Sequence, residues 1–396
     1  MITSESVGTA RQSMPKVTII QRIVPHYRVP FFEALHRELA HAGIELQLIY
    51  GQEYPGTVPR SELLEYPWTV RIENRYLNTP LGRLVWQACL SHVQDSDLIV
   101  FEQANSLLLN YWLMIRRGLR KHRLAFWGHG RNFQARSGHS LREGLKKWFI
   151  NQVDWWFAYT EASAAMVRES GFSPGRITVV QNAIDTNELE SALTGVTQAD
   201  LSGLRADLGL PNDHIGLYCG GMHAGKQLDF LLAACQTIRQ RITDFQVIFI
   251  GNGPEQGRIE RATQEHDWIH YVGPKFGLER AIYFKASQAL LIPSAVGLAI
   301  VDSFVTETPL FTTSLPSHGP EIAYLRNGEN GVMTAPSVND YANTVASFFE
   351  SAEQQQRLQM GCQQSAEIYT LDHMVSNFTM GIKSCLCIEG FQGRYR

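Results

Sequence analysis

Short apolar runs alternate with longer amphipathic stretches along most of this sequence, and the alternation occurs twice. In the first half, the strand-like KVTIIQRI is followed by the amphipathic VPFFEALHRELAHAG and then by the strand-like IELQLIY. The second half repeats the pattern from IGLYCGG to GVMT. Because parallel strands are joined by helical crossovers, this alternation predicts parallel sheets covered by helices. We therefore expect an α/β protein with two Rossmann-like domains.

The length of 396 residues supports two domains, because a single hydrophobic core rarely grows that large. Residues 191–211 carry no strand pattern and interrupt the alternation, and we interpret them as a linker plus the entry helix of the second domain. We expect a first domain over 1–190, a linker over 191–211, a second domain over 212–370, and a closing helix and tail over 371–396 that crosses back to the first domain. Two such domains enclose a cleft in which ligands usually bind.

The composition indicates a globular protein with a sizeable core, since 44% of the residues are hydrophobic and 18% are charged. The six cysteines form no CxxC pair, which is typical of a reducing cytosol. No signal-peptide pattern opens the sequence, and no apolar run approaches the roughly 18 residues of a membrane span. We expect a cytoplasmic protein.

Positive charge is concentrated between residues 111 and 150, a stretch that contains ten lysines and arginines and a single acid, Glu143. One interpretation is a solvated helix face. A second is peripheral contact with anionic lipid headgroups at the inner face of the cytoplasmic membrane. Nucleic acid is not expected as a partner, because no recognisable binding module surrounds the stretch.

Glycine-rich turns follow two strands of the second half. GGMHAGK, which ends at Lys226, nearly matches a phosphate loop, but Gln227 replaces the hydroxyl residue that would bind magnesium. Lys226 can still hold a phosphate at a helix start, and the alternative is a solvated lysine. GNGPEQG (251–257) lacks the acid that would bind a dinucleotide ribose, so it predicts only a tight turn. We therefore expect no NTPase and no dinucleotide cofactor.

Polar residues at the expected carboxyl ends of other strands are further candidates. His129 and Arg131 in FWGHGRNF can donate hydrogen bonds to hydroxyls or phosphate, although a lone histidine is often structural. Glu321, in the loop SHGPEI, can bind a ligand or cap a helix. Arg28, in PHYRVPFF, is either a contact for an anionic ligand or a surface arginine. The acid pair of DSD (95–97) precedes its strand, so we expect a solvated turn and no metal site.

The order of the motifs resembles one known family. LYCGGMHAGK, VIFIGNGPE, YVGP, LLIPSAVGLAIVDSF, TPLFTTS, GPEI and NGENG follow one another in the second half, and YRVPFFEAL, HGRN and VVQNAIDT occur in the first. The chain thus resembles the retaining GT-B glycosyltransferases of family 4, the glycosyl transferases group 1. The resemblance implies metal-independent transfer of a sugar from a UDP- or GDP-sugar to a glycan or lipid-linked acceptor, with retention, in bacterial surface polysaccharide or lipopolysaccharide synthesis.

The resemblance also assigns roles to residues. Lys226 and His129 are implied as catalytic residues, Asp302 as the ribose ligand and Glu321 as a donor-sugar contact. The diphosphate would be bound by Gly221, Lys226, Gly297, Leu298 and Ala299. Gly253 and Pro274 would flank the base, and Arg28 and Arg131 would lie on the acceptor side. The sequence departs from the family at Ser294, where a glutamate is usual, and at Gly221, where a basic residue is usual.

The stretch IPSAVGLAIVDS (292–303) has a physical interpretation of its own. Free N–H groups at Gly297, Leu298 and Ala299, at a helix start, suit a diphosphate, and Asp302 can accept ribose hydroxyls. The alternative is a glycine turn followed by an acid that favours the helix dipole. Two other functions stay open: a nucleotide-sugar epimerase of the same fold, and a non-catalytic nucleotide-sugar-binding subunit.

Overall fold

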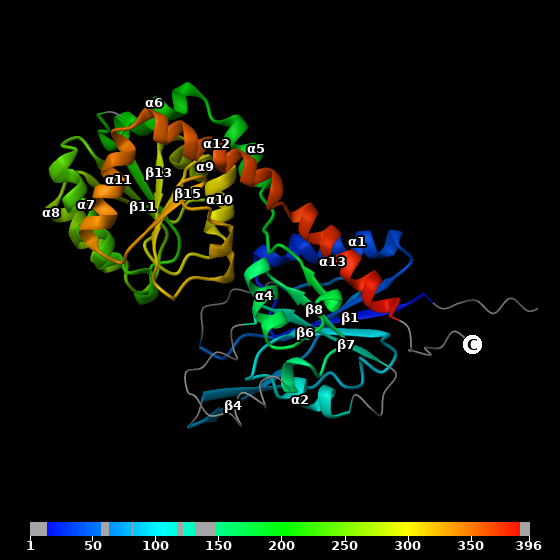
Figure 1. Cartoon of the computed structure of the whole chain (residues 1–396). Helices are drawn as coiled ribbons and strands as arrows, with labels where there is room; N and C mark the ends of the chain where they lie inside the picture. The colour runs from blue at the N-terminus through cyan, green and yellow to red at the C-terminus, as the bar shows by residue number, and fades with distance from the viewer. Residues whose placement is uncertain are drawn as a thin grey trace, which may run out of the picture. The chain divides into compact units, whose positions relative to one another are not determined.

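A computed structural model describes residues 14–56, 63–80, 82–116, 122–130, 148–211 and 213–388 (Figure 1). The chain divides into two compact units. The first contains residues 1–180 and 375–396, and the second contains residues 181–374. Each unit is built around its own parallel sheet, as the alternation in the sequence predicts.

The first unit, in its described part, has a seven-stranded parallel sheet of order β3-β2-β1-β6-β7-β8-β9. Its strands are β1 (Lys16–Gln21), β2 (Glu45–Tyr50), β3 (Thr69–Arg71), β6 (Leu98–Glu102), β7 (Arg123–Gly128), β8 (Trp155–Ala158) and β9 (Ile177–Val179). Its helices and 3₁₀ turns include η1 (His26–Arg28), α1 (Val29–His41), α2 (Leu108–Ile115), α4 (Glu161–Glu169) and η4 (Pro174–Arg176). The chain leaves β1 toward β2 on one side and later returns to β6 on the other. The carboxyl ends of β1 and β6 therefore form a topological switch point.

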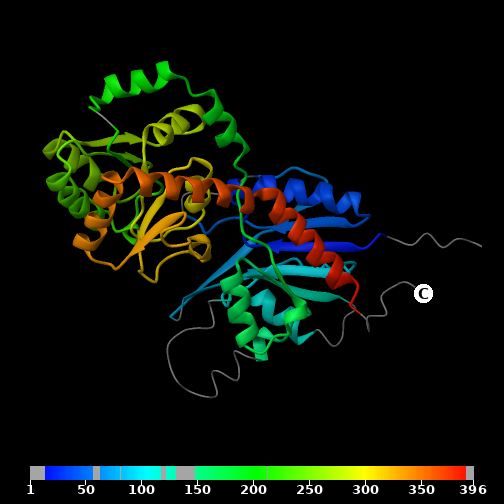
Figure 2. The same cartoon turned by 45° about the horizontal axis from the view of Figure 1, so that its top comes forward.

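The closing helix α13 (Leu371–Leu386) returns to the first unit, as expected, and lies beside α1 in both views (Figures 1 and 2). Phe378 of this helix stacks on Phe157 with ring centroids 4.2 Å apart. It also lies 5.1 Å from the ring of Trp127 and 5.5 Å from that of Phe31. The helix is held by this aromatic cluster, because such large rings bury extensive apolar area.

The second unit, in its described part, has a six-stranded parallel sheet of order β12-β11-β10-β13-β14-β15. Its strands are β10 (Ile215–Cys219), β11 (Gln246–Ile250), β12 (Ile269–Gly273), β13 (Ala289–Leu291), β14 (Leu310–Thr313) and β15 (Gly331–Thr334). Its helices and turns are α5 (Asn187–Gly195), α6 (Gln198–Leu208), η5 (Ala224–Lys226), α7 (Leu228–Arg241), α8 (Gln256–Glu265), α9 (Gly277–Ala286), α10 (Ala299–Val305), η6 (Pro320–Tyr324), α11 (Val338–Phe349) and α12 (Ala352–Ile368). Here the switch point lies between β10 and β13.

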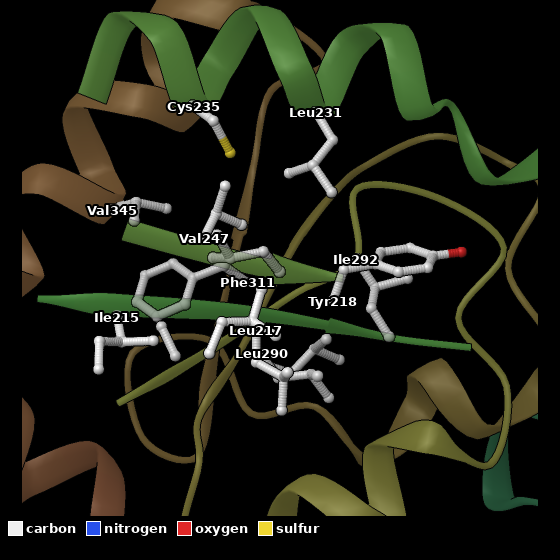
Figure 3. Packing of buried hydrophobic residues seen from close by; sticks show 14 of the residues in the cluster. Ile215, Leu217, Tyr218, Leu231, Cys235, Val247, Leu290, Ile292, Phe311 and Val345 are labelled. Atoms are coloured by element: carbon white, nitrogen blue, oxygen red, sulfur yellow. The ribbon is translucent and has the colours of Figure 1, made fainter. Parts of the chain in front are cut away.

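The core of the second unit is apolar on both faces of the sheet. Figure 3 shows Leu231 and Cys235 pointing from α7 toward side chains of the strands, among them Val247. Leu217 and Leu290 of the neighbouring strands β10 and β13 are fully buried. Continuous apolar strands are typical of a parallel sheet with helices on both faces, and they give the strand ends a rigid support.

The domain boundaries differ from those expected in the sequence. The first division falls after Val180, and residues 191–211 form the end of α5 and the whole of α6. Both helices pack against α9 of the second unit. A capping box between Thr197 and Asp200 starts α6. The expected entry helix corresponds to α6, but the part of the segment expected to be a linker belongs to the second unit, because it contains the end of α5.

An antiparallel hairpin of β4 (Asn74–Thr79) and β5 (Gly82–Gln87) was not expected. Its strands contain NRYLNT and GRLVWQ, which lack the regular alternation of apolar and polar residues that signals a half-buried strand. The hairpin is held instead by cross-strand pairing, with Tyr76 opposite Val85 and Leu77 opposite Leu84.

Candidate functional site

The predicted residues of the second unit gather at one edge of its sheet, because each follows the carboxyl end of a parallel strand. They are Gly221 and Lys226 after β10, Gly253 after β11, Pro274 after β12, Gly297, Leu298, Ala299 and Asp302 after β13, and Glu321 after β14. Ligands of open α/β sheets bind at this edge, near the switch point. In this unit the switch point lies between the loops that follow β10 and β13.

Lys226 joins those two loops. It ends the 3₁₀ turn η5, and its Nζ donates a hydrogen bond to the carbonyl oxygen of Ala295 at 2.7 Å. The side chain is half-buried, and desolvation lowers the pKa of the ammonium below its usual value. An ammonium has three donors, and one of them is used within the described part of the chain. The other two are available to a ligand.

The turn before α10 presents backbone donors. Within the described residues, the N–H groups of Gly297, Leu298 and Ala299 have no acceptor. A side chain added at Gly297 would meet no atom within 4 Å, so the space next to the turn is open. Ala295 holds a left-handed conformation, with φ of 51°, which places its carbonyl on Lys226. The arrangement can therefore bind an anion through a lysine and backbone amides.

Asp302 has a partner that the sequence did not indicate. Its Oδ2 forms an ion pair with Arg280 of α9, and the guanidinium also contacts the thiol of Cys219. Burial raises the pKa of Asp302, and the positive charge of Arg280 opposes that rise. One carboxylate oxygen is thus already engaged. Arg280 pairs with Oδ2, so Oδ1 is the oxygen that can accept from a ligand hydroxyl.

Glu321 is buried and fixed from a distant part of the chain. It accepts a hydrogen bond from the side-chain amide of Asn182, which is 139 residues away in the sequence. Tyr324 donates in turn to the carbonyl oxygen of Asn182 at 3.0 Å. Only 5% of Glu321 is exposed, so its carboxylate is oriented by the protein and is not a solvated cap. Asn182 lies in VVQNAIDT, one of the motifs of the family resemblance, but no role was predicted for this residue.

The glycines near β11 have a packing role. A Cβ at Gly253 would lie 2.2 Å from the carbonyl oxygen of Met222, and φ at this glycine is 152°. The N–H of Met222 also donates to the carbonyl oxygen of Asn252 at 2.7 Å. The loops after β10 and β11 are therefore in backbone contact, which only glycine permits. Gly221 lies exposed in the first of these loops, and Pro274 is exposed after β12.

Two predicted residues of the first unit also follow carboxyl ends of strands. Arg28 is buried, with its guanidinium 5.6 Å from the ring of Trp127, so it is not a surface arginine. His129 follows β7 and meets the ring of Tyr159 edge-on at 5.9 Å. Arg131 lies outside the described residues. Asp97 of the DSD segment lies before β6, at the opposite edge of the sheet, where its carboxylate accepts a hydrogen bond from the backbone N–H of Lys16 at 2.8 Å.

Glu102 is a candidate that sequence reasoning missed. It ends β6 at the switch point of the first sheet, and its Oε1 accepts from the backbone N–H of Arg22 at 2.6 Å. Burial raises its pKa, while Arg22 opposes the rise. No local sequence pattern marks the acid in VFE as a site residue, because its position at the switch point depends on the order of the strands in the sheet. An acid with a raised pKa at such a position is a functional candidate.

We expect Glu102→Gln to stabilise the protein at neutral pH. A raised folded-state pKa means that the stability gained below the unfolded value of 4.5 is lost as pH rises through the folded pKa. The neutral amide removes this loss and can still accept from Arg22. Urea unfolding between pH 5 and 8 should give a higher midpoint for the variant, with the gap widening as pH rises. The exposed Glu65→Gln is the matched control, and a lower midpoint for Glu102→Gln at pH 8 would contradict the expectation.

Within the described ranges, no group of three histidine, cysteine, aspartate or glutamate side chains lies in an arrangement suited to a metal ion. None of the helices in the same part of the chain is both long and apolar enough to cross a bilayer.

Two family models match the chain, one over most of each unit. Residues 31–188 match the model for Glycosyltransferase Family 4, and residues 213–351 match that for Glycosyl transferases group 1. The two matches together account for about three quarters of the chain. No curated protein gave a significant match.

Solved structures with the same fold cover nearly the whole chain. Anabaena Alr3699/HepE in complex with UDP is 14% identical with a TM-score of 0.65, over 94% of this chain and 100% of that one. Sucrose-phosphate synthase from Thermosynechococcus elongatus is 18% identical with a TM-score of 0.65, over 93% and 98%. The lipopolysaccharide outer core galactosyltransferase WaaB is 15% identical with a TM-score of 0.61, over 93% and 99%. With a glycosyltransferase family model on each unit and this shared fold, the chain is a glycosyltransferase of the GT-B type.

Proposed function

We propose that the chain transfers a sugar from a nucleotide diphosphate-sugar to a glycan or lipid-linked acceptor, with retention of the anomeric configuration, in bacterial surface polysaccharide or lipopolysaccharide synthesis. The main support is the hydrogen bond from Lys226 to Ala295, which places the ammonium at the turn before α10. The unpaired N–H groups of this turn follow directly in the sequence, and Asp302 lies a few residues further on. Anabaena HepE, of the same fold, was solved with UDP-glucose, and WaaB is a lipopolysaccharide galactosyltransferase.

The donor would bind along the carboxyl edge of the second sheet. The diphosphate carries the charge that Lys226 and the amides of Gly297, Leu298 and Ala299 complement. A ribose hydroxyl would donate to Oδ1 of Asp302, whose other oxygen faces Arg280. Glu321 would accept from a hydroxyl of the donor sugar, since Asn182 holds its carboxylate in place.

The reaction needs stabilisation of the leaving group above all. As the bond from the anomeric carbon to the phosphate oxygen breaks, the nucleoside diphosphate gains negative charge, and preorganised donors lower that barrier. The acceptor hydroxyl forms the new bond on the face that the leaving group vacates, and its proton passes to the departing phosphate oxygen. Lys226 is the residue that we assign to this stabilisation. No protein nucleophile is required.

The first unit would supply the acceptor side. Arg28 is buried and positively charged, which suits an anionic group of an acceptor. Glu102 ends β6 and His129 follows the neighbouring strand β7, and both can exchange hydrogen bonds with acceptor hydroxyls. Arg131, which lies outside the described residues, remains a predicted contact on the acceptor side.

Incubation with a panel of UDP- and GDP-sugars tests this function. Release of nucleoside diphosphate that depends on added lipid or glycan acceptor supports a glycosyltransferase acting on that acceptor. Conversion of the donor into an isomer without acceptor would point to an epimerase instead. Binding of a donor without turnover under any acceptor would point to a non-catalytic subunit, the alternative motivated by Ser294 and Gly221.

We also expect the protein to bind anionic membranes through the basic stretch 111–150. Its positive charge would attract anionic headgroups, and salt would weaken that attraction. Sedimentation with vesicles of phosphatidylglycerol and phosphatidylcholine should recover more protein than sedimentation with phosphatidylcholine alone, and the excess should fall as salt rises. Equal recovery from both vesicles would contradict the expectation.

A further inference from the structure

Two loops of the second unit are joined side by side at the carboxyl edge of the sheet. We call residues 293–298 the phosphate turn and residues 314–321 the acid loop. The hydroxyls of Ser294 and Ser317 lie 2.5 Å apart, and the N–H of Gly319 donates to the carbonyl oxygen of Val296 at 2.6 Å. The N–H of Val296 donates to Nδ1 of His318 at 3.2 Å. The acid loop therefore engages both backbone groups of Val296.

His318 is the centre of this connection. It is buried, and its Nε2 lies 2.7 Å from the carbonyl oxygen of Thr313 at the end of β14. Because Nδ1 accepts from a backbone N–H, the ring proton is assigned to Nε2, which donates to Thr313. The hydroxyl of Thr313 in turn donates to the carbonyl oxygen of Pro293 at 2.7 Å. One neutral imidazole thus links the end of β14 to the phosphate turn, which follows β13.

The hydrogen bonds between the two loops determine the direction of the backbone N–H groups that follow Val296. The carbonyl of Ala295 is held by Lys226, and both backbone groups of Val296 are held by the acid loop. Ala295 keeps a left-handed φ of 51°, a strained conformation for a residue with a Cβ, which persists only where neighbours enforce it. The peptide groups ahead of Gly297 therefore have little freedom to rotate.

We propose that His318 is a positioning residue for the donor diphosphate, because it presets the direction of the N–H groups of Gly297, Leu298 and Ala299. This inference rests on the proposed function. The same loop carries Glu321, and a Cβ at Gly319 would lie 2.6 Å from its carboxylate. The contacts with the diphosphate and with the donor sugar are thereby built on one connected pair of loops.

Calorimetric titration with UDP, UMP, GDP and GMP tests the proposal, using the base that the wild-type protein binds. The ratio of the Kd of the monophosphate to that of the diphosphate reports what the second phosphate adds. In His318→Ala this ratio should fall about tenfold, the effect of losing one well-oriented hydrogen bond to a charged group, while the monophosphate Kd changes little. His318→Asn should retain more of the ratio than His318→Gln, because the asparagine oxygen can take the place of Nδ1 and accept from Val296.

His270→Asn is the matched control, because this half-buried histidine bonds Gln246 at the start of β11, away from the phosphate turn. It should leave the ratio unchanged. If the wild-type protein binds no nucleoside diphosphate, the proposed function fails before this inference is reached. If it binds one and His318→Ala keeps the wild-type ratio, the inference fails alone. Equal loss of both ligands with a lower Tm would assign His318 a merely structural role and overturn the inference as well.

Discussion

Replacing Lys226 with methionine lowers turnover about 10²- to 10³-fold, while the KM for the donor changes less. The reason is that charge on the diphosphate is greatest as the glycosidic bond breaks, so a cation next to it stabilises the transition state more than the bound donor. Methionine retains most of the apolar stem of the half-buried lysine. Rates of nucleoside diphosphate release at saturating donor and acceptor measure the effect.

The control for this variant is Lys285→Met, which removes an exposed lysine from α9 of the same unit. Its turnover should match that of the wild type. Lys226→Arg should recover part of the loss, because it restores the charge with a different geometry. Loss of the bond to Ala295 also loosens the phosphate turn, so Tm is measured in parallel. Undiminished turnover in Lys226→Met would remove this lysine from the mechanism.

Much of the fold follows from local patterns. Apolar runs such as DLIVFE and QVIFIGNG correspond to β6 and β11, and the stretch from Val29 forms α1. Periodicity works for these elements because strands of a parallel sheet are buried on both faces and helices need one apolar stripe. The hairpin β4–β5 did not follow, since cross-strand pairs stabilise it without a long apolar run. The entry helix expected within 191–211 corresponds to α6, whereas α5, which reaches into the same segment, was not predicted.

The candidate site was predictable where a residue type and a strand end coincide, as at Lys226, Asp302 and Glu321. Its remaining members depend on contacts between distant segments. Arg280 reaches Asp302 from another helix, and Asn182 reaches Glu321 across 139 residues. A single sequence contains no record of such contacts, because strand order and helix register together decide which side chains meet.

The ion pair with Arg280 shows which oxygen of Asp302 is left for a ribose hydroxyl, and this allows a specific prediction for nucleotide affinity. Asp302→Asn should raise the Kd of nucleoside monophosphates and diphosphates alike, by about 10- to 100-fold, because the ribose is common to both and a hydrogen bond to a charged group contributes about 1.5–3 kcal/mol. The substitution also leaves the guanidinium of Arg280 without its carboxylate. Titration with UMP and UDP, or GMP and GDP, measures the change. A loss confined to the diphosphate would contradict a ribose contact.

Replacing Arg280 with methionine separates the two contributions. Burial raises the pKa of Asp302 and Arg280 opposes that rise, so without the cation the carboxylate takes up a proton at a higher pH. Since only the ionised form accepts strongly from a ribose hydroxyl, nucleotide affinity of Arg280→Met should be lower at pH 6 than at pH 8, with a smaller difference in the wild type. In Asp302→Asn this dependence should be absent, and the double variant should bind no worse than Asp302→Asn. An Arg280→Met protein with the wild-type pH profile would mean that Arg280 does not maintain the charge of Asp302, whatever the ribose contacts.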